Sequence, residues 1–172
     1  YLHTNTYDFD SSLSAQFIIK RMLEETNKWY ADNKVKISQS PYTFSEMITL
    51  ASVVEKESKF KEDRPKVAQV FYNRLEQNMK LESDITAAYA HQEHKVTMTY
   101  EDVAIDSPYN TYRVDGLPIG PINSPSKESF DAVINPEGDA FDYIFLYARP
   151  DGETFYSKTY ENHQRIQQQY RD

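Results

Sequence analysis

Glu55 is the residue of this chain whose type and position most directly indicate chemistry. Thr43 and Glu46 have the spacing of a capping box, which predicts a helix over residues 44–58. At about 100° per residue, the apolar side chains of this helix form one stripe, and Glu55 falls inside it. A carboxylate in apolar surroundings has its neutral form favoured, so we expect a raised pKa for Glu55. A general acid that works near neutral pH needs such a shift.

Periodicity alone leaves an alternative open for Glu55. A Glu at the rim of the stripe, with its carboxylate reaching water, is the more frequent arrangement, because Glu is rarely fully buried unless it is paired. Glu57 points roughly the opposite way, toward solvent or the flank of the helix. Between these two neighbours, helical spacing therefore favours Glu55 as the residue with a chemical role.

Asp84 is the second carboxylate with a candidate role in glycosidic chemistry. Two roles are open for it: an N-cap of a short helix ending near residue 90, which capping preferences favour, or a partner across a cleft. Arg74 lies at core spacing on a predicted helix, and a buried Arg needs an anion. Because a direct contact with Arg74 would lower the pKa of Glu55, we expect Arg74 to pair with Asp84.

The composition excludes several other kinds of site. The 172 residues suit one domain, and a net charge of -8 without a basic stripe argues against nucleic acid as a partner. The absence of Cys excludes disulfides, thiolate metal sites and cysteine nucleophiles. His91 and His94 lack the i, i+4 spacing of the metalloprotease helix, so we expect no metal and no cofactor. No apolar run is long enough to span a bilayer, and because Tyr1 is not a Met we expect an excised part of a longer protein.

The predicted elements place helices first and a small hairpin near the end of the chain. Besides residues 44–58, helices are expected over about residues 11–33 with Ser11 or Ser12 as the cap, from Pro65 onward, and over residues 84–90, 127–134 and 159–170. Residues 34–41 are expected to form a loop, and residues 96–99 a short strand or a loop. Three Pro and two Gly within residues 116–125 predict a rigid irregular loop. Strands are expected within residues 142–148 and 154–158, joined by a Pro-Asp-Gly turn, which makes the fold class α+β.

These segments, in this order, resemble the YceG-like family, the MltG-type endolytic murein transglycosylases. The matching motifs lie at residues 50–57, 67–75, 79–89, 109–112, 116–122, 124–125 and 155–159, followed by His163. The resemblance implies a mainly helical, lysozyme-like catalytic part with a small antiparallel β element and a Pro/Gly-rich loop. It implies a catalytic domain over residues 1–172, with the membrane anchor and LysM-like part of the family lying before Tyr1.

The resemblance also implies a reaction. Family members cleave the MurNAc–GlcNAc β-1,4 bond of peptidoglycan without water and leave a 1,6-anhydro-MurNAc end. The catalytic Glu of the family maps onto Glu55, which would first protonate the glycosidic oxygen and then take the proton of the MurNAc C6 hydroxyl. Asp84 is then not needed as a second catalytic carboxylate. Substrate contacts are expected from Asn73, Arg74, Asp84, Thr86, Asn110, Thr111, Tyr112, Leu117, Pro118 and Gly120, with a purely bracing role as the alternative for the loop residues.

The implied partners are peptidoglycan glycan strands, penicillin-binding proteins and other wall-synthesis proteins, and a membrane reached through an anchor outside this sequence. The implied location is the extracytoplasmic face of the bacterial cell membrane. Two other functions compete with this interpretation. One is a hydrolytic muramidase that uses Asp84 to activate water or to form a covalent intermediate. The other is a glycan-binding scaffold of the wall-synthesis machinery that cuts little.

Overall fold

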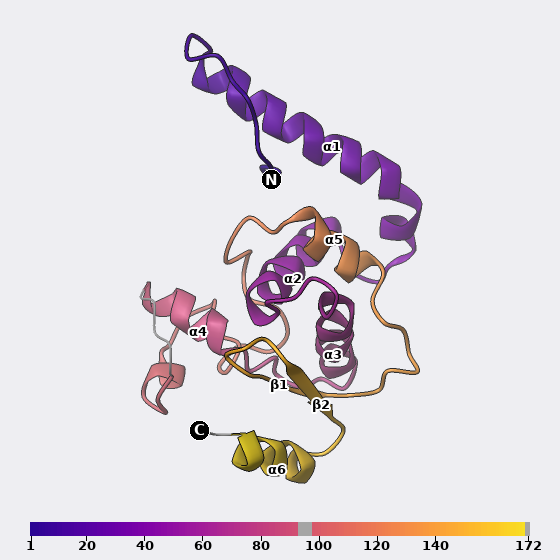
Figure 1. The fold of residues 1–172 in the computed structure, drawn as a ribbon, viewed down its shortest axis with the longest axis vertical. Coiled ribbons are helices and arrows are strands. Elements are labelled where there is room, and N and C mark those ends of the chain that lie inside the picture. Colours follow the sequence, from indigo (N-terminus) through magenta and orange to yellow (C-terminus); the bar gives the residue numbers. More distant parts are fainter. Residues whose placement is uncertain (93–97, 171–172) are drawn as a thin grey trace.

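The structure, a computed structural model, describes residues 1–92 and 98–170 and has helices arranged around one central helix (Figure 1). The elements in chain order are α1 (Ala15–Gln39), α2 (Phe44–Glu57), α3 (Arg64–Glu76), α4 (Asp84–His91), the 3-10 turn η1 (Asp102–Ala104), α5 (Lys127–Ile134), β1 (Phe145–Ala148), β2 (Thr154–Ser157) and α6 (Tyr160–Tyr170). A mainly helical domain with one two-stranded antiparallel sheet confirms the predicted α+β class.

The central helix α2 is buried on all of its sides. Its first turn carries the predicted capping box, in which Thr43 accepts from the N–H of Glu46 and the Glu46 carboxylate accepts from the N–H of Thr43. Every residue from position 47 to position 54 is buried, because α3, α4 and α5 all pack against this helix. The single apolar stripe predicted for α2 is therefore too narrow, since a helix that is apolar or small all round lies in the core.

The hairpin near the end of the chain forms as predicted and is tied to the helical part. Phe145 pairs with Ser157 and Ala148 with Thr154. Gly152 in the turn adopts a left-handed φ of 104°, and a Cβ there would lie 2.5 Å from the ring of Phe60. A side chain at this turn position would therefore strain the backbone and collide with the loop that follows α2.

The first helix differs from its predicted bounds at both ends. Ser14 is the N-cap in place of the expected Ser11 or Ser12, and its hydroxyl accepts from the N–H of Phe17 at 3.3 Å. The helix continues through residues 34–39, which were expected to form a loop, and ends shortly before Pro41. No Pro or Gly lies within residues 34–39 to end the helix earlier.

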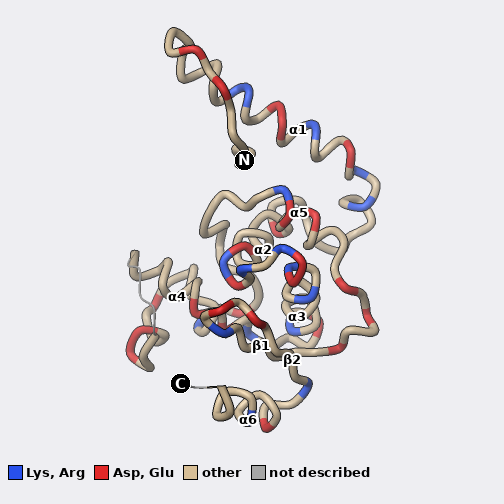
Figure 2. Tube along the Cα trace, in the orientation of Figure 1, with Lys and Arg blue, Asp and Glu red and all other residues tan. Residues whose placement is uncertain are grey.

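Only part of α1 contacts the core. Trp29 packs against Phe130 of α5 in a tilted arrangement with ring centroids 4.8 Å apart, whereas Phe17 is 50% exposed. The rest of α1 extends away from the body, and acidic and basic residues alternate along it (Figure 2). Within residues 1–92 and 98–170, no helix has the length and apolar character needed to cross a membrane.

Residues 96–99, expected to be a strand or a loop, lie mostly outside the described part of the chain. The described residues 98 and 99 are not in a strand, and Thr99 precedes η1. The irregular segment from residue 106 to residue 126 and the helix α5 both agree with their predictions.

Candidate functional site

Glu55, near the C-terminal end of α2, is surrounded by hydrogen-bond donors. Its Oε2 accepts from the N–H of Ser126 at 3.1 Å, from the Ser126 hydroxyl at 2.6 Å and from the Ser129 hydroxyl. Its Oε1 accepts from the Arg64 guanidinium at 3.2 Å. Ser126 is the N-cap of α5, so the carboxylate lies at the N-terminus of that helix, where the helix dipole favours a negative charge.

The pKa of Glu55 is lowered as a result. Burial, the largest single influence, raises it, but the hydrogen bonds from Ser126 and Ser129 and the charge of Arg64 together outweigh burial. The prediction of apolar surroundings and a raised pKa is therefore wrong. Helical periodicity within α2 gives no information on these partners, because they come from α3 and from the start of α5. In this geometry Glu55 is a carboxylate that joins α2 to α5.

Glu57, the last residue of α2, lies on another side of the helix and faces the start of α4. The Ser83 hydroxyl donates to Glu57 Oε1. Burial raises the pKa of Glu57 to about 7, and the charge of Asp84 adds to this effect, while the Ser83 hydrogen bond and Arg74 oppose it. The side chain is still partly exposed. Glu57 was expected to point toward solvent or the helix flank, and it lies on the flank, which the start of α4 covers.

The segment that carries Ser83 is fixed by a buried hydrogen-bond network. The Ser83 N–H donates to Thr111 Oγ1 at 3.0 Å, the Thr86 hydroxyl donates to the Ser83 carbonyl at 2.7 Å, and the Thr111 N–H donates to Thr86 Oγ1 at 3.1 Å. Thr86 and Thr111 are both 0% exposed. Their side chains therefore hold Ser83 against Glu57, and this burial favours a supporting role over the predicted contact with substrate.

Arg74 fixes the same segment from the side of α3. It donates to the Leu81 carbonyl at 2.5 Å and to the Glu82 carboxylate at 3.0 Å, and Phe145 of β1 lies 5.5 Å from its guanidinium carbon. The predicted pairing of Arg74 with Asp84 is wrong. Glu82 has a left-handed φ of 49°, which turns the chain so that Glu82, and not Asp84, meets the guanidinium. Arg74 is buried and its hydrogen bonds go to this segment, which favours a supporting role over the predicted contact with substrate.

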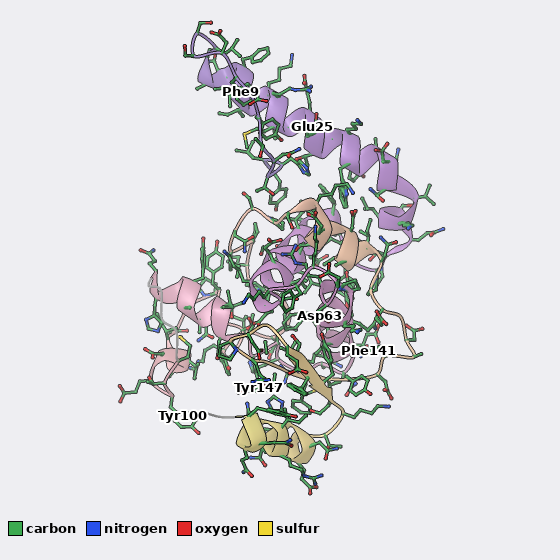
Figure 3. The ribbon with its side chains drawn as sticks, viewed as in Figure 1. Phe9, Glu25, Asp63, Tyr100, Phe141 and Tyr147 are labelled. Atoms are coloured by element: carbon green, nitrogen blue, oxygen red, sulfur yellow. The ribbon has the colours of Figure 1, made fainter. Side chains whose placement is uncertain are left out.

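Asn73 and Asn110 also support loops and do not line a binding surface. The Asn73 amide donates to the carbonyls of Phe141 and Tyr143, both at 2.8 Å, where the chain beyond α5 passes α3 (Figure 3). Asn110 is 0% exposed and its amide donates to the carbonyls of Val103 and Ile105. Since buried carbonyls need donors, both amides are committed to the backbone, contrary to their predicted contact with substrate.

Replacing Asn73 by Ala is expected to lower the free energy of unfolding by about 2 kcal/mol, because two carbonyls lose their donor. Urea unfolding followed by circular dichroism measures this change. Asn162→Ala on the exposed side of α6 is the matched control and should change stability by less than about 0.5 kcal/mol. Equal stability of Asn73→Ala and the wild type would contradict the assigned role.

Asp84 and Tyr112 are the predicted binding residues that lie beside Glu57 and remain accessible. Asp84 is the first residue of α4, with Ser83 in the N-cap position that was also considered for Asp84. The Tyr112 hydroxyl donates to Asp84 Oδ1 at 2.6 Å. Burial, this hydrogen bond and the charges of Asp84 and Glu57 all raise the pKa of Tyr112, so its hydroxyl keeps its proton.

The irregular loop of residues 116–125 is anchored to α2. The Ile122 N–H donates to the Ser52 hydroxyl at 3.0 Å, and Asn123 donates to the Ser52 carbonyl at 2.6 Å. Leu117 packs against the core and Pro118 is buried, which favours the bracing role for these two residues. Gly120 lies under the Tyr109 hydroxyl, which would be 3.6 Å from a Cβ at this position.

His91, one of the two histidines considered as metal ligands, contacts the backbone beside η1. His91 Nε2 lies 2.9 Å from the Asp102 carbonyl oxygen, and His94 lies outside the described residues. Within residues 1–92 and 98–170, no group of three or more His, Asp and Glu could hold a metal ion.

Sequence reasoning missed Glu57 and its partner Ser83. One signal could have found them: residues 48–54 carry no charge, so the whole circumference of α2, and not one stripe, is suited to burial. On such a helix, position on the wheel cannot distinguish Glu55 from Glu57. What distinguishes them is the neighbouring segment that each meets.

The fold and the site together define a mainly helical domain in which Glu57, at the end of the central helix, has a carboxyl with a raised pKa. The chain belongs to the YceG-like family, whose family model matches residues 1–169. It is 39% identical over 171 residues to an endolytic murein transglycosylase of Bacillus subtilis strain 168, covering 99% of this chain and 47% of that protein. It is 36% identical to an endolytic murein transglycosylase of Streptococcus pneumoniae strain D39, covering 96% of this chain and 31% of that protein.

A solved structure agrees with the sequence comparisons. The crystal structure of a yceG-like protein from Listeria monocytogenes superimposes with a TM-score of 0.87 at 38% identity, covering 96% of this chain and 54% of that one. The fold is therefore that of the YceG-like family. The chain spans about half or less of the length of the curated relatives it matches.

Proposed function

We propose that this chain is the catalytic domain of an endolytic murein transglycosylase, with Glu57 as its general acid and then its general base. The relatives named for this activity match nearly the whole chain, which supports the reaction class. The single observation that carries the assignment of the acid is the environment of Glu57. Its carboxyl faces the start of α4 and has a pKa raised to about 7 by burial, while the residue as a whole is partly exposed.

In the proposed cycle, Glu57 starts protonated and donates its proton to the glycosidic oxygen as the bond from that oxygen to C1 of MurNAc breaks. The resulting carboxylate then takes the proton of the MurNAc C6 hydroxyl, whose oxygen bonds to C1 and closes the 1,6-anhydro ring. Glu57 ends protonated, and no water is consumed. The Ser83 hydroxyl, which donates to Oε1, orients the carboxyl and supports the ionised intermediate state.

The sequence prediction of Glu55 as the catalytic residue is not tested by the comparisons, but the geometry favours Glu57. Glu55 is ionised, accepts hydrogen bonds from Ser126 and Ser129, and is paired with Arg64, so it has no proton to donate. A carboxylate held in this way is a poor general acid. Glu55 is better suited to hold α2 against α5, and thereby to hold Glu57.

Several wider predictions accompany this proposal. We propose that residues 1–172 form one catalytic domain with a lysozyme-like helical part, supported by the acidic residue at the end of a buried helix. We also propose peptidoglycan glycan strands as the substrate, penicillin-binding and other wall-synthesis proteins as partners, and an extracytoplasmic location at the membrane. The names of the relatives support the substrate. The partner proteins and the membrane location rest on the family resemblance alone.

Digestion of purified sacculi with this protein is expected to release muropeptides that end in 1,6-anhydro-MurNAc. Mass spectrometry separates them from hydrolysis products. Adding water to the same bond gives a reducing MurNAc end, which is heavier by one water molecule, about 18 Da. Reducing ends alone would overturn the proposal. The muramidase alternative has one observation in its favour, the exposed Asp84 carboxylate beside Glu57, and it would be supported by that outcome. Binding without any cleavage would support the scaffold alternative.

A further inference from the structure

The Tyr112–Asp84 hydrogen bond lies beside Glu57 and joins two segments that border it. Asp84 begins α4, yet its side chain does not cap the helix, and among the described residues it has no cation partner within ion-pair distance. Its Oδ1 instead accepts from the Tyr112 hydroxyl at 2.6 Å. The two residues come from segments 28 positions apart, so the contact joins α4 to the loop that precedes residue 116.

Asp84 is an immediate neighbour of Ser83, whose hydroxyl touches Glu57. The negative charge of Asp84 therefore raises the pKa of Glu57, and the charge of Glu57 in turn raises the pKa of Tyr112. Two negative charges close together oppose each other, so an ionised Asp84 makes it harder for Glu57 to lose its proton.

The other charged groups around Glu57 do not supply this effect. Arg74 on α3 faces Glu57 and favours its ionised form, but Arg74 is paired with Glu82 at 3.0 Å. Glu82, in the segment before α4, is thereby partly neutralised. Tyr112, on the loop, keeps its proton and is uncharged. Of the two charged groups that act on Glu57, Arg74 and Asp84, only Asp84 has no partner of opposite charge within the described part of the chain.

We propose that the Tyr112–Asp84 pair is a positioning device for the acid: Tyr112 holds the Asp84 carboxylate beside Glu57, and the charge of Asp84 sets the pH at which Glu57 gives up its proton. Asp84 does not take part in bond making. The expected effect of Asp84 on the cleavage rate rests on the proposed function. The electrostatic coupling between Asp84 and Glu57 does not, because it is present whatever reaction the protein catalyses.

The direct test is a carbon NMR titration of the Glu carboxyl signals, with the Glu57 signal assigned by its absence in Glu57→Gln. Asp84→Asn is expected to lower the titration midpoint of Glu57 by about one pH unit. Tyr112→Phe leaves the charge but frees it to move, so a smaller downward shift is expected. The matched control is Asp115→Asn, which removes an equal charge from a side chain that is 94% exposed and paired with Lys80. It should leave the midpoint of Glu57 unchanged.

The second readout is the pH profile of sacculus digestion. In Asp84→Asn the alkaline limb should move to lower pH by the same amount, so the ratio of the rate at a pH above the limb to the rate below it falls about tenfold relative to the wild type. An unshifted midpoint in Asp84→Asn, or an equal shift in Asp115→Asn, would overturn the inference. A shifted midpoint in a protein that releases no anhydro-muropeptides would overturn the proposed function and leave the coupling standing.

Discussion

Glu57→Gln is expected to reduce cleavage of sacculi by about 10³-fold or more, because a single residue supplies both the acid and the base of the proposed cycle. Gln has nearly the same shape but no proton to donate and no charge with which to accept one. The measurement is the initial rate of anhydro-muropeptide release at pH 6, below the titration midpoint of about 7 expected for Glu57.

The fold of Glu57→Gln should survive, and its stability has a signed pH dependence. The pKa of Glu57 is about 7 in the folded protein against 4.5 as its ordinary value. The folded state therefore binds more protons between these values, so the wild type loses stability as pH rises through that range. The Gln variant lacks this loss and should be at least as stable as the wild type at pH 8. Full activity in Glu57→Gln, or loss of activity explained by unfolding, would count against the assignment.

The sequence predicted the layout of this domain well where local signals are strong. The capping box at Thr43, Pro65 at the start of α3 and the Pro-Asp-Gly turn before β2 each act within a few residues. Their predictions hold because no distant contact competes with them. The end of helix α1 was predicted wrongly. The helix continues through residues 34–39, which were expected to form a loop, because no Pro or Gly there ends it.

The site was less predictable, because its chemistry depends on contacts between segments far apart in the sequence. Ser126 and Ser129 lie more than seventy positions from Glu55, and they convert an expected raised pKa into a lowered one. Ser83 reaches Glu57 across 26 positions. The family resemblance indicates this helix and the neighbouring segments, but the choice between two carboxylates on that helix needs the positions of their partners.

The same reasoning explains why several predicted binding residues turn out to support the site. Thr86, Asn110 and Thr111 lie in the motifs that carry the resemblance, but all three are fully buried. Polar residues in such motifs attract a binding interpretation. The hydrogen bonds of Thr86 and Thr111 instead hold the segment with Ser83, which places these two residues one contact away from Glu57. Asn110 instead donates to the carbonyls of Val103 and Ile105. A sequence alone does not separate residues that touch a ligand from residues that hold those that do.

Glu55→Gln is expected to destabilise the fold by about 2–3 kcal/mol at pH 7, since it removes the anion that Arg64, Ser126 and Ser129 share. The Arg64 side chain is only 11% exposed and would lose its only ion-pair partner within the described residues. Urea unfolding measures the difference. Glu128→Gln, on the first turn of α5 with a side chain 49% exposed, is the matched control and should cost less than about 0.5 kcal/mol.

The pH dependence of this variant distinguishes an ionised structural carboxylate from a protonated acid. The pKa of Glu55 is lowered in the folded protein, so its stabilising contribution is fully present above the ordinary Glu value of 4.5 and is lost as pH falls through the lower folded value. The stabilities of wild type and Glu55→Gln should therefore differ most at neutral pH and converge in acid. A difference that grows as pH falls would mean that Glu55 is protonated in the fold, and would return it to the role of the acid.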